Sequence, residues 1–397
     1  MLNYLAAQDE SKCCGCGACA EICPQNALSL KANKEGFRYP ALDADRCSDC
    51  KLCEKVCPEM NPPQKAEPLE IYALQSKNAE ELFESSSGGA FRLVADSVIQ
   101  QGGAVVGCVW NEKMEPILTI ADSLDGLRPM QGSKYLSSST EHTYSQIKKL
   151  LDAGRMVLFT GTPCQCAGLL NYLRKPYDKL LTMEFLCHGV PSQLAFDAYR
   201  ERCEKHRGGK MSQYKCRDKS AHGWAISESY RVNGKKYTAH GMTSSYLFGF
   251  ISGYFNRYSC YTCKFRGLER FTDYTISDFW GYQQELHKQE GISAFQVNTQ
   301  KGKAYMTQFA KNARLHIAKR EDVAVENPAI LHSHEEAVPA LRKTIYLQLQ
   351  TDGWAAVEKK HLRCRHFWLK KLWYVLPDQV TATLRKLTHG NSAYKYR

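Results

Sequence analysis

The sequence predicts an α+β/α/β protein with a cysteine-rich N-terminal module, a mixed α/β body and a basic, helical C-terminal extension. Nine of the 18 cysteines fall between Cys13 and Cys57, and apolar segments of strand and helix length alternate through the middle of the chain. Residues 341–397 carry 12 Lys or Arg against 3 Asp or Glu, a net charge of +9 out of +12 for the whole chain. We therefore expect domains at residues 1–66, 67–320 and 321–397.

The N-terminal cysteines contain one spacing written twice. The run Cys13-x-x-Cys16-x-x-Cys19-x-x-x-Cys23-Pro24 recurs as Cys47-x-x-Cys50-x-x-Cys53-x-x-x-Cys57-Pro58. This is the pattern of bacterial two-cluster ferredoxins, in which the fourth cysteine of each run ligates the other [4Fe–4S] cluster. We assign one cluster to Cys13, Cys16, Cys19 and Cys57, and the other to Cys47, Cys50, Cys53 and Cys23. Structural zinc sites are the alternative, but they leave the third thiolate of each run unexplained.

The composition favours a protein that keeps its thiols reduced. A hydrophobic fraction of 43% and a charged fraction of 24% are ordinary for a globular chain with a sizeable core. The N-terminus lacks the apolar stretch of a signal peptide, and Lys370 and Lys371 interrupt the last long apolar run. We expect a cytoplasmic protein with metal-bound thiolates rather than disulfides.

The body reads as alternating strands and helices. A strand at 27–30 and a proline-rich linker at 61–65 precede it. Further strands are expected at 71–76, 104–110, 155–159, 180–186, 227–232, 236–239 and 274–278, and the last clear strand at 291–297. Helices are expected after Gly89, at 143–151, after Pro163 and at 303–313. This alternation favours an α/β body with active loops at strand ends, although neither a G-x-G-x-x-G nor a P-loop motif is present.

Four further cysteines lie next to Pro or Gly or form a Cys-x-x-Cys pair: Cys164, Cys187, Cys260 and Cys263. Two of them follow predicted buried strands, where an open α/β sheet gathers its ligands. Spacing alone favours small buried hydrophobes at these positions.

Six ordered motifs change this interpretation. They are Ser86-Ser87-Gly88-Gly89-Ala90-Phe91, Gln131-Gly132-Ser133-Lys134-Tyr135, Thr160-Gly161-Thr162-Pro163-Cys164-Gln165, Cys187-His188-Gly189-Val190-Pro191-Ser192, Ser259-Cys260-Tyr261-Thr262-Cys263 and Asp278-Phe279-Trp280-Gly281. From Leu69 to Ala318 the chain resembles the coenzyme F-420 hydrogenase/dehydrogenase beta-subunit family. That family includes ferredoxin-fused bacterial members and is related to 7-hydroxymethyl chlorophyll a reductase.

The resemblance implies a third [4Fe–4S] cluster on Cys164, Cys187, Cys260 and Cys263, beside a bound FAD. Cys166 stands where the family usually has an apolar residue, which leaves open which thiolate of this helix ligates. The resemblance places ten residues around the flavin: Ser87, Gly88, Gly132, Ser133, Lys134, Tyr135, Asp278, Trp280, Gly291 and Ser293. Small residues would admit a diphosphate and Lys134 would offset its charge.

Three charged or titratable residues are further candidates. His188 follows a proposed ligand and is the first candidate for proton delivery, against the alternative of a histidine that hydrogen-bonds its loop. Arg217 and Lys219 could hold an anionic substrate group or belong to a solvated edge strand.

The C-terminal extension interleaves aromatic and basic residues. From Val357 on, Leu362, Trp368 and Leu372 alternate with Lys and Arg. We favour a helix packed on the body with a solvated basic side; a helix lying on an anionic membrane face is the alternative. Either form suits docking of an acidic electron donor.

Taken together, the motifs predict a cytoplasmic iron–sulfur flavoprotein oxidoreductase. We expect electrons from a low-potential donor such as ferredoxin to pass through [4Fe–4S] clusters to FAD and on to an organic substrate. The organic substrates that this hypothesis includes are a surface-polysaccharide intermediate and a deazaflavin, and the sequence is compatible with an oligomer. A non-catalytic electron-transfer subunit of a larger complex is the second hypothesis. A zinc-dependent nucleic-acid binder is the third, but the chain lacks aromatic–basic interleaving outside the extension.

Overall fold

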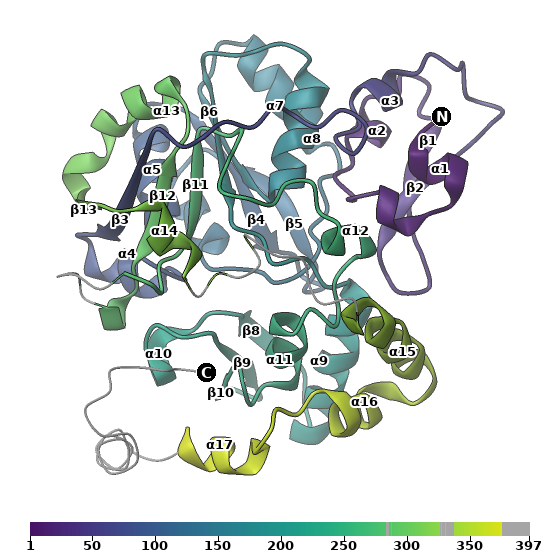
Figure 1. Cartoon of the computed structure of the whole chain (residues 1–397), viewed down its shortest axis with the longest axis vertical. Coiled ribbons are helices and arrows are strands. Elements are labelled where there is room, and N and C mark those ends of the chain that lie inside the picture. Colours follow the sequence, from purple (N-terminus) through teal and green to yellow (C-terminus); the bar gives the residue numbers. More distant parts are fainter. Residues whose placement is uncertain (283–285, 287, 326, 328–329, 331–336, 375–397) are drawn as a thin grey trace.

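The N-terminal module is a small α+β unit. The computed structural model describes the chain except residues 283–285, 287, 326, 328–329, 331–336 and 375–397 (Figure 1). The module contains α1 (Asn3–Ala7), η1 (Glu10–Lys12), α2 (Ala18–Glu21), α3 (Leu52–Lys55), and the antiparallel strands β1 (Leu28–Ala32) and β2 (Arg38–Leu42). Gly15 and Gly17 have φ of 74° and 82°, so the first cysteine loop turns through conformations that favour glycine.

The body is built on a mixed sheet of eight strands among the described residues. Their order is β13 (Ala313–Ile317), β3 (Glu70–Ser76), β12 (Ser293–Val297), β11 (Tyr274–Asp278), β7 (Leu180–Phe185), β6 (Val157–Gly161), β4 (Ala104–Trp110) and β5 (Pro116–Ala121). Strands β4, β6, β7 and β11 are parallel, and antiparallel strands flank them on both sides. The carboxyl ends of the parallel strands therefore meet at one edge.

Both faces of this sheet are covered by helices, which explains its continuous apolar runs. Val105 and Leu158 pack on one face with residues of α5 (Ala90–Gln100). Their neighbours Val106 and Phe159 pack on the other face with α7 (Thr143–Asp152) and α8 (Pro163–Leu173). Each strand thus contributes alternate side chains to two cores.

A second lobe has its own core. It contains the antiparallel sheet β10 (Lys235–His240), β9 (Ser227–Val232) and β8 (Met211–Lys215), together with α9 (Gln193–Arg207), α11 (Ser245–Ile251), α15 (Ala337–Thr351) and α16 (Gly353–His361). Tyr346 and Trp354 of the last two helices lie in this core, and so do Phe37 and Tyr39 of the N-terminal module. The last two helices therefore share a core with residues of the domain predicted at 67–320, and the boundary at residue 321 stays a prediction.

The remaining elements are short. They are α4 (Ala79–Glu84), α6 (Leu124–Leu127), η2 (Arg128–Met130), α10 (Lys219–His222), α12 (Tyr258–Tyr261), η3 (Lys288–Glu290), α13 (Gln300–Tyr305), η4 (Met306–Gln308), η5 (Ala310–Asn312), α14 (Arg320–Ala324) and α17 (Phe367–Trp373). In α17, Trp368 and Leu372 are 65% and 60% exposed, whereas Leu362 before it is buried. No helix in the described part of the chain is long and apolar enough to cross a membrane.

Most predicted elements are present within a few residues of their expected bounds. The helix predicted at 303–313 is wrong beyond Tyr305, because short 3-10 turns follow there. The strand at 291–297 is also not the last one, because β13 comes after these turns. Strand β13 pairs with β3 on the outer edge of the sheet, and its Ile317 is 82% exposed. An edge strand with an exposed apolar residue lacks the alternation by which strands are recognised.

The N-terminal module is fixed to the body by buried polar contacts. Arg342 of α15 is fully buried and pairs with Glu35, with Nη1 donating to Oε1 at 2.9 Å. Thr140 and Tyr144 each donate a hydroxyl hydrogen bond of 2.9 Å to the carbonyl oxygen of Cys16. In Figure 1 the module lies against α8 and α12. The module is thus part of one packed unit.

Candidate functional site

The first set of predicted ligands surrounds one cavity. Cys13, Cys16, Cys19 and Cys57 all line one cavity that opens to solvent and measures about 410 Å³ with the open space at its mouth included. Cys57 comes from the second cysteine run, so the structure brings the fourth cysteine of that run to the first three of the other. This is the arrangement that the two-cluster spacing predicts, and the thiol donor set fits a cubane cluster.

The second set lies at the surface of the module. Cys47 and Cys50 are exposed, and Cys23 and Cys53 are partly buried. The amide of Ala27 donates a hydrogen bond of 3.3 Å to Sγ of Cys23. We refer to the Cys13 set as the inner site and to the Cys47 set as the outer site.

A second cavity, in the body, gathers the other four predicted cysteines. Cys164, Cys187, Cys260 and Cys263 line a space that opens to solvent and measures about 840 Å³ with the open space at its mouth included. Cys164 and Cys187 follow β6 and β7, so they come from neighbouring carboxyl ends of the parallel strands. Within the described residues no three His, Cys, Asp or Glu side chains lie close enough together to bind a single metal ion directly. The thiols instead line the walls of a common space, and we call it the body site.

Two cysteines of α8 have different surroundings. Thr162 caps this helix in a capping box with Gln165, which fixes the first turn beside the cavity. Cys164 lines the cavity, with Sγ 3.1 Å from the hydroxyl of Thr162. Cys166 is fully buried in the core below the sheet and is not part of the cavity wall. The structure therefore favours Cys164 over Cys166 as the residue available to a cluster.

The inner site and the body site share a wall. Cys14, Gly15 and Glu59 line both cavities, and the Cys14 thiol contacts the thiols of Cys16 and Cys164. Burial raises the pKa of Glu59, with Lys264 opposing this shift. Cys14 falls outside the repeated spacing, so the sequence assigns it no role. Only its adjacency to Cys13 could have drawn attention to it.

His188 also lines the body site, between Cys187 and Gly189. Its carbonyl oxygen accepts a hydrogen bond of 3.1 Å from the side-chain amide of Asn256. The structure thus places the predicted proton donor at the cavity, while its catalytic role stays a prediction.

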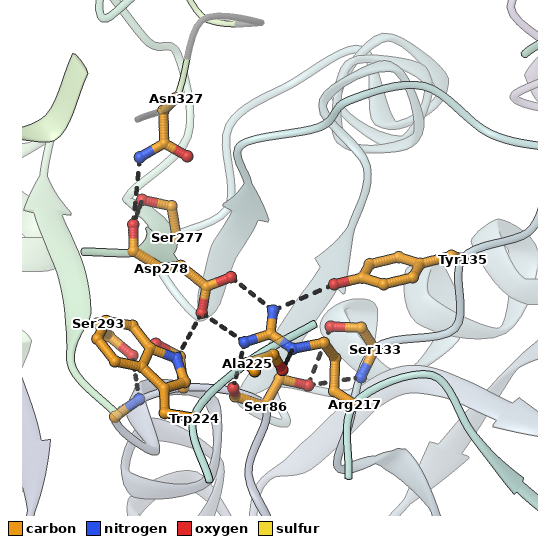
Figure 2. Close-up of polar contacts among 12 residues, drawn as sticks. Ser86, Ser133, Tyr135, Arg217, Trp224, Ala225, Ser277, Asp278, Ser293 and Asn327 are labelled. Atoms are coloured by element: carbon orange, nitrogen blue, oxygen red, sulfur yellow. Dashed lines mark hydrogen bonds and ion pairs between the residues drawn. The ribbon is translucent and has the colours of Figure 1, made fainter. Parts of the chain in front are cut away.

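The predicted flavin residues converge on a buried arginine. Arg217 donates to both carboxylate oxygens of Asp278 at 2.5 and 3.1 Å, and Figure 2 shows it between Asp278, Tyr135 and Ser86. Its side chain is 2% exposed. Trp280 stacks on Trp224 with ring centroids 4.2 Å apart. Arg217 therefore ties together three of the sequence motifs, and neither a solvated edge strand nor a free anion-binding group describes it.

Two lysines near these motifs also donate hydrogen bonds to backbone carbonyl oxygens of the protein. Lys134 donates to four carbonyl oxygens of residues 129–132, at 2.8 to 3.1 Å, and burial lowers its pKa to about 8. Lys219 donates to the carbonyl oxygens of Leu82, Ser87 and Glu290, and burial, together with Arg217, lowers its pKa to about 7. The ammonium of Lys134 thus stabilises its own loop by hydrogen bonds to these carbonyls rather than facing a diphosphate, contrary to our expectation.

The predicted flavin glycines differ in the space around them. A Cβ at Gly88 would collide with the Leu74 carbonyl, and one at Gly291 would lie 2.8 Å from the Ser87 carbonyl. The amide of Gly88 donates to the hydroxyl of Ser293 at 2.9 Å. At Gly132, with φ of 78°, a Cβ would meet nothing within 4 Å. Gly132 and the hydroxyls of Ser86 and Ser133, 3.0 Å apart, therefore form the part of this surface that fits an approaching ligand.

Comparisons with known proteins agree with the cysteine pattern. Residues 154–323 match the family described as the C terminus of the beta subunit of coenzyme F-420 hydrogenase/dehydrogenase, and residues 12–61 match the 4Fe-4S dicluster domain. Cys164, Cys187, Cys260 and Cys263 lie within the first match, whereas Ser87 and residues 132–135 precede it.

Among solved structures, the chain is similar to one from the F-420-reducing [NiFe] hydrogenase complex of Methanosarcina barkeri. The sequence identity is 15% and the TM-score 0.46, over 72% of this chain and 94% of that chain. No curated protein matches. The family resemblance inferred from the six motifs is confirmed by the match over residues 154–323. With its 4Fe-4S dicluster domain, the chain is an iron–sulfur electron-transfer protein related to the beta subunit of coenzyme F-420 hydrogenase.

Proposed function

We propose that this protein is an iron–sulfur flavoprotein oxidoreductase that takes electrons from a low-potential donor such as ferredoxin and delivers them to an organic substrate. The observation that carries the proposal is the shared wall at Cys14, Gly15 and Glu59, which puts the inner site directly beside the body site. Iron–sulfur centres supply one-electron transfer, and a flavin couples it to two-electron chemistry.

The proposed order of the sites follows from their exposure. Cys47 and Cys50 face solvent, so the outer site is where a protein donor can approach. The inner site adjoins the body, and the body site lies at the carboxyl ends of β6 and β7. Cys164, Cys187, Cys260 and Cys263 would hold a third cluster there, and His188 would deliver protons beside it.

The proposed flavin, FAD, would lie against the surface made by Ser86, Gly132, Ser133, Tyr135 and Trp280. Lys134, Arg217 and Lys219 make internal contacts in this region, so we assign them to positioning the loops rather than to binding the cofactor. The protein's own contribution there is a scaffold of hydroxyl groups and an open glycine turn.

The decisive experiment is to purify the protein anaerobically and measure iron, sulfide, zinc and flavin per chain. We expect about twelve irons and one flavin. Cys164→Ser should lower iron to about eight, whereas Cys166→Ser should leave it unchanged. About eight irons in the unaltered protein would overturn the body cluster, and zinc without flavin would overturn the oxidoreductase. Substrate screening with reduced ferredoxin should include a deazaflavin and surface-polysaccharide intermediates.

A second candidate is a non-catalytic electron-transfer subunit of a larger complex. The description of the matching family as a beta subunit favours it. It predicts that the isolated chain reduces viologen-type dyes but no organic substrate, and that it co-purifies with partner subunits. Turnover of an organic substrate by the isolated chain would exclude it.

A further inference from the structure

Arg257 is a buried cation at the boundary between the N-terminal module and the body. It lies three residues before Cys260, just ahead of α12, and is 1% exposed. Its Nε donates to the carbonyl oxygen of Cys13 at 2.6 Å, and Nη2 donates to the carbonyl oxygen of Arg38 at 2.9 Å. The guanidinium also lies 3.9 Å above the ring of Tyr39.

The contacts of Arg257 lead into the inner site. Nη2 is 3.4 Å from Sγ of Cys13, a predicted cluster ligand. A Cβ placed on Gly15 would lie only 2.9 Å from Nη1, so the side chain reaches across the first cysteine loop. Nη1 is buried and has no hydrogen-bond partner in the described part of the chain.

Among the described residues, no carboxylate lies within 4 Å of the Arg257 guanidinium. The other buried arginines each pair with a carboxylate within 4 Å: Arg92, Arg217, Arg270 and Arg342. A buried charge is costly unless it is paired. A cubane with four thiolate ligands is an anion, and it gains a further negative charge on reduction, so the inner site can supply the missing partner.

We propose that Arg257 is the internal counter-ion of the inner iron–sulfur centre and raises the reduction potential of that centre. A fixed positive charge stabilises the reduced, more negative cluster in a site of low dielectric. The charge therefore favours transfer of one electron, without a proton, from the outer centre to the inner one. The inference deepens the proposed function but needs only the two centres of the dicluster domain.

The test is a redox titration of anaerobic, full-length protein, followed by electron paramagnetic resonance. Cys50→Ser, which removes the outer centre, assigns the two signals. We expect Arg257→Met to lower the inner potential by at least a tenfold change in the reduction equilibrium, about 59 mV for one electron. The outer potential should stay unchanged, and Arg257→Lys should retain most of the original value because it keeps the charge.

Arg342→Met is the matched control, because Arg342 is equally buried against the module but pairs with Glu35 rather than with a cysteine. It should loosen the module without moving either potential. An unchanged inner potential in Arg257→Met, or an equal shift of both centres, would overturn the proposal. If Arg257→Met loses the inner centre, retention of iron and potential in Arg257→Lys supports it, and loss in both variants overturns it. Iron and flavin contents test the proposed function separately.

Discussion

The inner and outer sites share one cysteine spacing but have different surroundings. At the inner site Cys16 is 6% exposed, and the body supplies Thr140, Tyr144 and Arg257 as contacts of the first cysteine run. At the outer site Cys47 and Cys50 face solvent. Burial and hydrogen bonding set the reduction potential and the accessibility of such a cluster. Two clusters with the same motif can therefore differ in role, one accepting electrons from a donor and the other passing them toward the body.

This difference arises from the body rather than from the motif. Phe37 and Tyr39 of the module are inserted into the core of the second lobe, where they pack with residues of α15, and α12 contacts η1 of the module. In the second cysteine run only the end reaches the body, where Val56 packs in the core, whereas Cys47 and Cys50 are exposed at the surface. The difference between the inner and outer sites can be tested with variants that remove contacts between the module and the body.

The largest expected difference is in the rate of iron loss. Anaerobic protein treated with a strong iron chelator should release the outer iron roughly tenfold faster or more than the inner iron, because local exposure governs access. Iron release over time should therefore be biphasic. Cys50→Ser should lack the fast phase. A single phase, or a fast phase that persists in Cys50→Ser, would contradict the assignment.

The next largest effect concerns the buried ion pair between α15 and the module. Arg342→Met leaves Glu35 partly buried without its partner and should cost about 2–4 kcal/mol of local stability. The exposed pair Arg38–Glu141 is the control, with side chains 44% and 58% exposed, and Arg38→Met should cost less than about 1 kcal/mol. Native-state hydrogen exchange of β1 and β2 measures both. Equal effects would mean that Arg342 does not hold the module.

Much of the local structure could be predicted from the sequence. The repeated cysteine spacing predicts the dicluster domain, and the strands expected at 104–110 and 155–159 correspond to β4 and β6 of the sheet. The sequence analysis does not predict strands β5, β8 and β13 or helix α9, and the helix predicted at 303–313 reaches only the first residue of β13. At the edges of the sheet, pairing with a neighbour decides the conformation and local preference does not.

The site residues show a similar division. Spacing groups Cys57 with the first cysteine run, and the structure brings it there. Arg217 and Arg257 could not be understood from sequence, because their partners are distant carboxylates and carbonyls that only the fold brings near. The partners of Lys134 are carbonyls of its own loop, but only the folded loop turns them toward its ammonium. A charged residue in a sequence looks solvated until its burial is known.

A smaller effect on stability is expected where α17 packs against the second lobe. Unlike the contacts of the module, this contact should depend on pH. Tyr374, at the end of α17, stacks on His240 with centroids 3.9 Å apart. Burial, with His222 and Lys370, lowers the pKa of His240 to about 4. A depressed folded-state pKa means that the unfolded segment binds more protons, so stability is lost as pH falls below about 6.5.

Between pH 7 and pH 5, α17 should therefore lose about 1–2 kcal/mol, allowing for the partial exposure of His240. Hydrogen exchange of residues 367–374 should speed up accordingly. His240→Gln should remove most of this dependence. Equal acceleration in the variant would assign the effect to other groups.

The smallest effect tests how the body holds the first cysteine loop. Thr140→Val removes one of the two hydroxyl donors to the Cys16 carbonyl, and Tyr144→Phe removes the other. Each single variant should cost about 1 kcal/mol, because the remaining hydroxyl still satisfies the buried carbonyl. The double variant leaves that carbonyl without either donor, so its cost should exceed the sum of the singles by about 1 kcal/mol. Hydrogen exchange at residues 16–20 provides the free energies. Additive costs would show that the two hydroxyls act independently, and would contradict the expected coupling through the Cys16 carbonyl.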